Sequence, residues 1–168
     1  MVRLCIDRKR LVMNKIFDKV NNCLEKFIGG EIFFDELDKQ IKFDKQLLEE
    51  LFYKAKNENA EVIASGEIGL CLHNYGFPID IIVQGGLRKN KEVLDLSPFI
   101  DVNKDYVFID DSYFSGKTAQ VIKEEIERCG AKLKCVWVAY DGSQAPIHKV
   151  KSLYRYYDNF DVLGRKIK

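Results

Sequence analysis

Residues 106–130, YVFIDDSYFSGKTAQVIKEEIERCG, contain an apolar run, two adjacent acids, a short turn and an amphipathic pattern. The apolar run from Tyr106 to Ile109 predicts a buried strand. The spacing of apolar residues from Thr118 to Cys129 predicts a helix, which the following glycine ends. A strand that leads through a short turn into a helix is the building unit of α/β folds.

The turn between these two elements has the features of an anion-binding site. Gly116 allows a close approach of the backbone, and the amides from Ser115 to Thr118 lie at the predicted helix N-terminus, where the dipole favours a phosphate. The two hydroxyls can add donors, and the carboxylates of Asp110 and Asp111 can accept from a diol or hold Mg²⁺ through water. The structural alternative is a plain helix start with Ser115 as N-cap.

Two other phosphate motifs are excluded by single residues. A G-x-x-x-x-G-K-T loop needs glycine at position 111, where the chain has Asp111. A haloacid-dehalogenase nucleophile needs two acids separated by one residue, whereas the two acids here are adjacent.

Outside this segment the pattern predicts further strands and helices in alternation. Strands are expected at 61–64, 79–83 and 135–139, and the second is a branched apolar run that suits a strand covered on both faces. A glycine-containing loop at 65–69 and a brief helix through Leu72 should separate the first two strands. This alternation predicts an α/β fold: a Rossmann-like open parallel sheet with helices on both faces.

The first 60 residues have a helical pattern. Apolar residues recur at helical spacing from Leu11 to Ile28, and a second helical stretch runs to Ile41. A third helix is expected after Asp44, its N-cap. The apolar side of that helix consists of Leu47, Leu48, Leu51, Phe52 and Ala55.

Two later segments carry weaker signals. Residues 85–104 are polar and weakly patterned, which predicts a long loop of the kind that often forms a functional lid. An aromatic face for a base could come from Tyr154, Tyr156, Tyr157 and Phe160. The alternation of Leu153, Arg155 and Tyr157 favours a C-terminal strand on the core.

Composition excludes several classes of protein. The 27 Lys and Arg nearly balance the 26 Asp and Glu, so bulk charge indicates neither nucleic acid nor membrane as a partner. Five cysteines without a C-x-x-C pair fit neither a disulfide framework nor a zinc site. His73 and His148 lack ligand-like companions in the sequence. No apolar stretch approaches the ~20 residues that span a bilayer, and we expect a cytoplasmic protein.

VFIDDSYFSGKT, residues 107–118, resembles the phosphoribosyl pyrophosphate (PRPP) motif of type I phosphoribosyltransferases. EVIASGEIGLCLHNYGFPIDIIV, residues 61–83, resembles that family's first strand, pyrophosphate loop, helix and second strand. LRKNK, residues 87–91, resembles the start of its mobile loop, and CGAKLKCVWVAYDG, residues 129–142, resembles the following helix end and strand. The resemblance thus covers roughly residues 60–142 in the family's order.

The resemblance implies roles for individual residues. Asp110 and Asp111 would hold the ribose hydroxyls and Mg²⁺. The residues expected around the 5′-phosphate are Ser112, Tyr113, Phe114, Ser115, Gly116, Lys117 and Thr118. Those expected at the pyrophosphate are Ser65, Gly66, Glu67, Ile68 and Gly69. The basic residues expected to neutralise the leaving group when the loop closes are Arg88, Lys89 and Lys91.

The implied activity is that of a glycosyltransferase, which moves the phosphoribosyl group of PRPP to a nitrogen of a nucleobase and releases pyrophosphate. The resemblance also implies nucleoside monophosphate binding and a homodimer. Two residues depart from the family pattern: Glu67 puts a carboxylate near the pyrophosphate, and Phe114 stands where members commonly have Thr or Asp. A non-catalytic PRPP- or nucleotide-binding regulatory protein of the same fold is therefore the alternative.

We expect a single domain over residues 1–168. A helical N-terminal flank would occupy 1–57, the phosphoribosyltransferase-like core 60–142, and a C-terminal hood or strand 143–168. The resemblance places the choice of base in these flanks, so the sequence does not name the acceptor.

Overall fold

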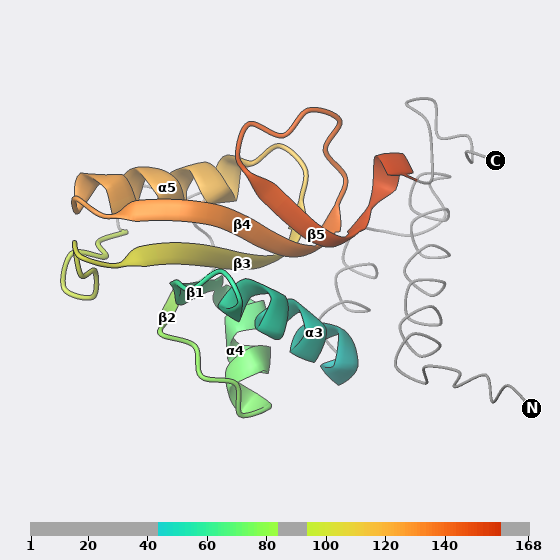
Figure 1. The fold of residues 1–168 in the computed structure, drawn as a ribbon, viewed down its shortest axis with the longest axis horizontal. Helices are drawn as coiled ribbons and strands as arrows, with labels where there is room; N and C mark the ends of the chain where they lie inside the picture. The colour runs from blue at the N-terminus through green and yellow to red at the C-terminus, as the bar shows by residue number, and fades with distance from the viewer. Residues whose placement is uncertain (1–43, 84–93, 159–168) are drawn as a thin grey trace, which may run out of the picture.

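The computed structural model describes residues 44–83 and 94–158, which form a parallel sheet with helices on its faces (Figure 1). The helices are α3 (Lys45–Lys56), α4 (Gly66–Asn74) and α5 (Lys117–Arg128), and a 3-10 turn follows at Tyr156–Asp158. The strands are β1 (Glu61–Ser65), β2 (Ile81–Val83), β3 (Asp105–Tyr113), β4 (Lys132–Asp141) and β5 (Val150–Arg155). The two helical stretches expected before Asp44 lie outside the described residues, as do Arg88, Lys89 and Lys91.

The sheet has five strands in the order β2-β1-β3-β4-β5, and every neighbouring pair is parallel. The prediction of an open parallel α/β sheet is therefore confirmed. From β1 the chain moves outward to β2 and then returns to β3 on the other side of β1. The strand order thus reverses between β1 and β3, and open α/β sheets bind ligands outside the carboxyl ends of the strands at such a switch point.

Helices cover both faces of the sheet, with α5 on one side and α3 and α4 on the other (Figure 1). Alternate residues of each strand belong to two separate apolar clusters. Val107 and Ile109 of β3 join the cluster under α3 and α4, whereas Tyr106 and Phe108 join the cluster under α5. Burial on both faces explains why the strands read as nearly continuous apolar runs.

Helix α3 confirms the prediction made from its apolar spacing. The Asp44 carboxylate accepts hydrogen bonds from the amides of Gln46 and Leu47, so it is the N-cap. The five residues of the predicted apolar side are all buried: Leu47, Leu48, Leu51, Phe52 and Ala55.

The loop expected at 65–69 is wrong, because α4 begins at Gly66 directly after β1. Ile68 and Leu72 lie one helical turn apart and are both buried, so packing on the sheet stabilises the helix despite its glycines. A Cβ on Gly69 would lie 2.9 Å from Cγ2 of Ile82 and 3.3 Å from Cβ of Ala64. This glycine therefore lets α4 approach the sheet closely rather than opening a loop.

Strands β3 and β4 are longer than their apolar runs predicted. Asp110, Ser112 and Tyr113 pair with Val138, Tyr140 and Asp141 of β4, so the ladder continues through the polar segment. Strand β2, in contrast, begins at residue 81 rather than at 79. The predicted C-terminal strand is confirmed as β5, which ends at Arg155, and Tyr157 lies in the 3-10 turn that follows.

Residues 94–104 form no helix or strand, as expected of a loop. Glu125 of α5 anchors the beginning of this segment through a hydrogen bond from Leu96. The amide of Leu96 donates to Oε1 of Glu125 at 2.9 Å, and Nε of Arg128 donates to Oε2 at 2.9 Å. The hydrogen bond from Arg128, followed by that from Leu96, holds the pKa of Glu125 below its ordinary value of 4.5 in spite of burial.

This depressed pKa predicts a pH-dependent stability. A carboxyl with a lowered folded pKa contributes stability above the unfolded value of about 4.5, and that contribution is lost as the pH falls through the folded pKa. We expect the difference in unfolding free energy between wild type and Glu125→Gln to shrink between about pH 6 and about pH 3. Urea titrations at several pH values measure it, and a constant difference would contradict the assignment.

Across residues 44–83 and 94–158, no helix is long and apolar enough to cross a membrane.

Candidate active site

The candidate site lies at the carboxyl ends of β1 and β3, at the switch point of the sheet. Ser65 is the last residue of β1, and Asp110 lies near the end of β3, 45 residues later. The hydroxyl of Ser65 donates to Oδ1 of Asp110 at 2.7 Å. One residue from the predicted pyrophosphate segment and one from the predicted ribose pair are therefore in direct contact.

Each of the two adjacent acids accepts a hydrogen bond from the backbone amide of the residue that follows it. The amide of Asp111 donates to Oδ1 of Asp110 at 2.9 Å. Oδ1 of Asp111 accepts from the amide of Ser112 at 2.6 Å and from its hydroxyl at 3.1 Å. Both carboxylates are half-buried. Their orientation is thus set before any ligand binds, which lowers the cost of binding.

Two helix N-termini face this edge without a side-chain cap. Ser65 stands at the N-cap position of α4, but its hydroxyl bonds Asp110 rather than the helix amides. The N-cap of α5 is Gly116, which has no side chain and a φ of 74°. Uncapped N-terminal amides carry the positive end of the helix dipole, so each helix start favours an anion.

The interpretation of Ser115 as a conventional N-cap is therefore wrong. Ser115 is exposed, and its Oγ lies 3.5 Å from the amide of Lys117, at the limit of a hydrogen bond. Gly116, whose φ lies in the left-handed region, occupies the N-cap position instead.

The turn borders a small pocket of about 10 Å³, which is room for about one water molecule. Among its lining are seven of the residues expected at the sugar phosphate: Asp110, Ser112, Tyr113, Phe114, Gly116, Lys117 and Thr118. A phosphate on the turn would therefore lie across the mouth of this pocket rather than inside it.

Phe114 is directed mainly at the core rather than at a phosphate. Its ring meets Tyr140 edge-on at a centroid distance of 5.7 Å and packs against the α3 and α4 side of the sheet. A Cβ on Gly142 would lie 2.7 Å from Cδ1 of Phe114. The aromatic ring at this position thus fixes the turn by packing on the core.

The residues expected at the pyrophosphate divide into two groups. Ser65, Gly66 and Glu67 lie at the end of β1 and in the first turn of α4, at the site. Ile68 and Gly69 lie on the buried side of α4 and present no side chain there. Glu67 is exposed, and a carboxylate in a first helical turn favours the dipole but repels a bound pyrophosphate.

Beside the turn at Gly116 lies a hydrogen-bonded cluster of Tyr113, His148 and Gln120, which the sequence did not indicate. Tyr113 Oη lies 2.7 Å from Nδ1 of His148, and Nε2 of His148 lies 2.8 Å from Oε1 of Gln120. Burial raises the pKa of Tyr113 and lowers the pKa of His148, so both are neutral near pH 7. The sequence does not reveal the companions of His148, because they lie 28 and 35 residues away along the chain.

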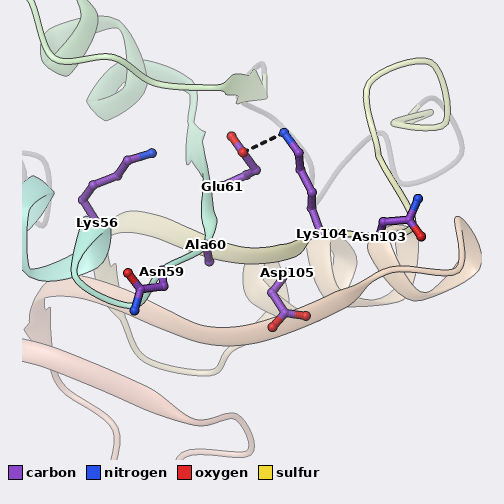
Figure 2. A pocket seen from close by; sticks show the side chains of 7 residues that line it. All are labelled: Lys56, Asn59, Ala60, Glu61, Asn103, Lys104 and Asp105. Atoms are coloured by element: carbon purple, nitrogen blue, oxygen red, sulfur yellow. Dashed lines mark hydrogen bonds and ion pairs between the residues drawn. The ribbon is translucent and has the colours of Figure 1, made fainter.

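A larger pocket of about 510 Å³ lies at the opposite edge, at the amino ends of β1 and β3 (Figure 2). Both lysines of this pocket pair with a carboxylate. Lys104 lies 2.8 Å from Glu61, which also lines the pocket, and Lys56 lies 3.8 Å from Asp80. Because its lysines are matched by carboxylates and it is remote from the switch point, we do not assign the chemistry to this pocket.

No protein-family model matches the sequence, and no curated protein sequence matches it. Among solved structures, the chain is similar to the purine phosphoribosyltransferase of Pyrococcus horikoshii, with 18% identity, 66% of this chain and 80% of that one covered, and a TM-score of 0.45. For the orotate phosphoribosyltransferase of Mycobacterium tuberculosis the identity is 13%, 71% of this chain and 77% of that one are covered, and the TM-score is 0.49. For a hypoxanthine phosphoribosyltransferase of Staphylococcus aureus the identity is 17%, 73% of this chain and 76% of that one are covered, and the TM-score is 0.45. At this level the likeness assigns no activity, and the function has to be argued from the site itself.

Proposed function

We propose that this protein is a phosphoribosyltransferase, which transfers the phosphoribosyl group of PRPP to a nitrogen of a nucleobase-type acceptor and releases pyrophosphate. One observation carries the proposal: two uncapped helix N-termini, those of α4 and α5, flank the linked pair Ser65 and Asp110 at the switch point of the sheet. PRPP likewise carries two phosphate groups on either side of a diol. The order of the features in the site therefore corresponds to that of the ligand.

The binding roles follow from this arrangement. The turn before α5 would hold the 5′-phosphate through the amides that follow Ser115, with Lys117 and Thr118 beside it. The start of α4 would receive the pyrophosphate. Asp110 and Asp111 would accept hydrogen bonds from the ribose hydroxyls between the two anion sites.

Positioning and charge would supply most of the catalysis. The bond from C1′ to the pyrophosphate oxygen breaks with its electron pair leaving on the oxygen. The acceptor nitrogen forms the new bond to C1′ and passes its proton to water or to the released pyrophosphate. A ribosyl centre that becomes cation-like is stabilised by the nearby carboxylates of Asp110 and Asp111. Arg88, Lys89 and Lys91, which lie outside the described residues, would neutralise the leaving group.

The acid pair fits Mg²⁺. Two carboxylates and a serine hydroxyl at the end of a strand are the hard oxygen donors that Mg²⁺ takes along with substrate oxygens and water. The part of the chain that the structure describes has no group of three or more His, Cys, Asp or Glu side chains arranged as a metal cage. Asp110 and Asp111 would therefore hold the ion together with the substrate, and the ion would neutralise pyrophosphate charge.

A binding protein without turnover is the second candidate. Glu67 favours it, because an exposed carboxylate in the first turn of α4 opposes a pyrophosphate at that helix start. Such a protein would keep the phosphate turn and bind PRPP or a nucleoside monophosphate as a signal.

Calorimetric titration with PRPP and Mg²⁺, followed by a pyrophosphate-release assay with a panel of nucleobases, tests both candidates. Binding with release in the presence of one base supports the transferase and names its acceptor. Binding without release for any base supports the binding protein. Failure to bind PRPP or any nucleoside monophosphate contradicts both.

A further inference from the structure

We propose that His148 is a positioning residue for the phosphate turn: through Tyr113 and Gln120 it holds the backbone around Gly116 in the shape that receives the 5′-phosphate. This inference rests on the proposed function, because it assigns the support of that same site. In this role His148 acts through Tyr113 and Gln120 rather than on the phosphate directly. It comes from the connection 142–149 between β4 and β5, a different part of the chain from the turn.

The hydrogen bonds of this cluster form a chain with one direction. Nε2 of Gln120 donates to Oε1 of Glu124 at 2.9 Å, and a carboxylate only accepts, so Oε1 of Gln120 must face His148. Nε2 of His148 therefore carries the proton, and Nδ1 of the neutral ring accepts. The hydroxyl of Tyr113 then donates to Nδ1 at 2.7 Å and accepts from the amide of Ile147 at 3.3 Å.

Every member of this chain thus has a defined donor or acceptor role. A neutral imidazole bonded at both nitrogens is fixed in both tautomer and ring orientation. The cluster connects three elements, namely the end of β3, the first turn of α5 and the connection 142–149.

Gly116 of the turn packs against Tyr113 and His148 of this cluster. A Cβ on Gly116 would collide with the hydroxyl of Tyr113 and would lie 3.1 Å from Nδ1 of His148. The backbone of Gly116 is thus in contact with the pair, and the position of the pair decides how far the turn can sink toward the sheet. Because the amides after Gly116 form the anion site, a shift of the pair shifts the site.

The connection 142–149 can serve as a support because it is short. Strand β5 begins level with Val136, in the middle of β4, so eight residues suffice to return the chain. The connection runs on the same side of the sheet as α5 and beside the start of that helix (Figure 1). Its first amide, that of Gly142, donates to the carbonyl of Tyr113 at 2.9 Å. Three hydrogen bonds that join Tyr113 to Gly142, Ile147 and His148 therefore anchor this connection to β3.

The test separates the two anion sites of the proposed function. His148→Phe keeps a ring of similar shape and removes both hydrogen bonds. We expect its affinity for ribose 5-phosphate to fall about tenfold, which corresponds to roughly the net worth of one or two lost hydrogen bonds. Its affinity for pyrophosphate with Mg²⁺ should remain that of wild type, because the hydrogen bonds of His148 join the end of β3 and the first turn of α5 rather than the start of α4. Calorimetry with the two ligands measures both affinities.

His73→Phe is the matched control, because His73 is the other histidine of the chain and lies exposed in the last turn of α4. We expect wild-type affinity for both ligands. If His148→Phe does not fold, as melting curves would show, Tyr113→Phe and Gln120→Leu remove one link each and should give the same selective loss. Equal losses for the two ligands, or no loss for ribose 5-phosphate, would overturn the positioning role. A wild-type protein that binds neither ligand would instead overturn the proposed function.

Discussion

Replacement of Gly116 by alanine is expected to abolish measurable PRPP binding and to destabilise the fold. The residue has a φ of 74°, and an added Cβ would collide with the Tyr113 hydroxyl. Left-handed strain costs about 1–2 kcal/mol and overpacking of a filled site about 1–3 kcal/mol, so a loss of roughly 2–5 kcal/mol in unfolding free energy is expected. The collision moves the amides of the turn, and affinity should fall by about a hundredfold or more.

Gly76→Ala is the matched control for this substitution. Gly76 also has a positive φ, of 87°, but an added Cβ there has no atom within 4 Å. It should therefore lose only the backbone contribution of about 1–2 kcal/mol and keep wild-type PRPP affinity. Thermal unfolding and calorimetry measure the two effects. Tight PRPP binding by Gly116→Ala would contradict the assignment of the turn.

The double substitution Asp110→Asn and Asp111→Asn should eliminate transfer while the protein remains folded. The amide keeps an oxygen that can accept from Ser65 and from the backbone amides, so the local hydrogen bonds persist. The two negative charges that would hold the ribose hydroxyls and Mg²⁺ are lost. We expect a fall in pyrophosphate-release rate of about a hundredfold or more, which is the scale for removal of a charge-stabilising group.

Asp105→Asn is the control for the loss of charge. Asp105 carries an exposed carboxylate at the amino end of β3, eight residues before Tyr113. It lines the pocket of Figure 2. Its replacement should leave the rate unchanged. Unchanged PRPP affinity and rate in the double variant would refute the ribose assignment, whereas a broad drop in melting temperature would indicate a structural role for the pair.

The apolar patterns of the sequence were reliable where burial decides the structure. The side of α3 that packs on the sheet, and the strands β1, β3 and β4, follow from spacing because buried residues must be apolar. The ends of the elements were less reliable. Strand β3 continues to Tyr113 because β4 lies beside it and pairs with its polar residues, and no local signal carries that information.

The segment after β1 shows how tertiary contacts override local preference. Two glycines in five residues predicted a loop at 65–69, yet the segment forms the start of α4. Gly69 is needed for close packing against Ile82, and Ser65 is drawn to Asp110 instead of capping its own helix. Each cause is a contact with another strand, so the local sequence could not reveal it.

The sequence by itself determined the strand, the pair Asp110 and Asp111, and the glycine turn, because these features lie within a dozen residues and their chemistry is local. Only the tertiary structure decided that Ser65 meets Asp110 and that His148 supports the turn. The physical reason is the parallel sheet: it brings the carboxyl ends of β1, β3 and β4 to one edge, although the chain separates them by tens of residues.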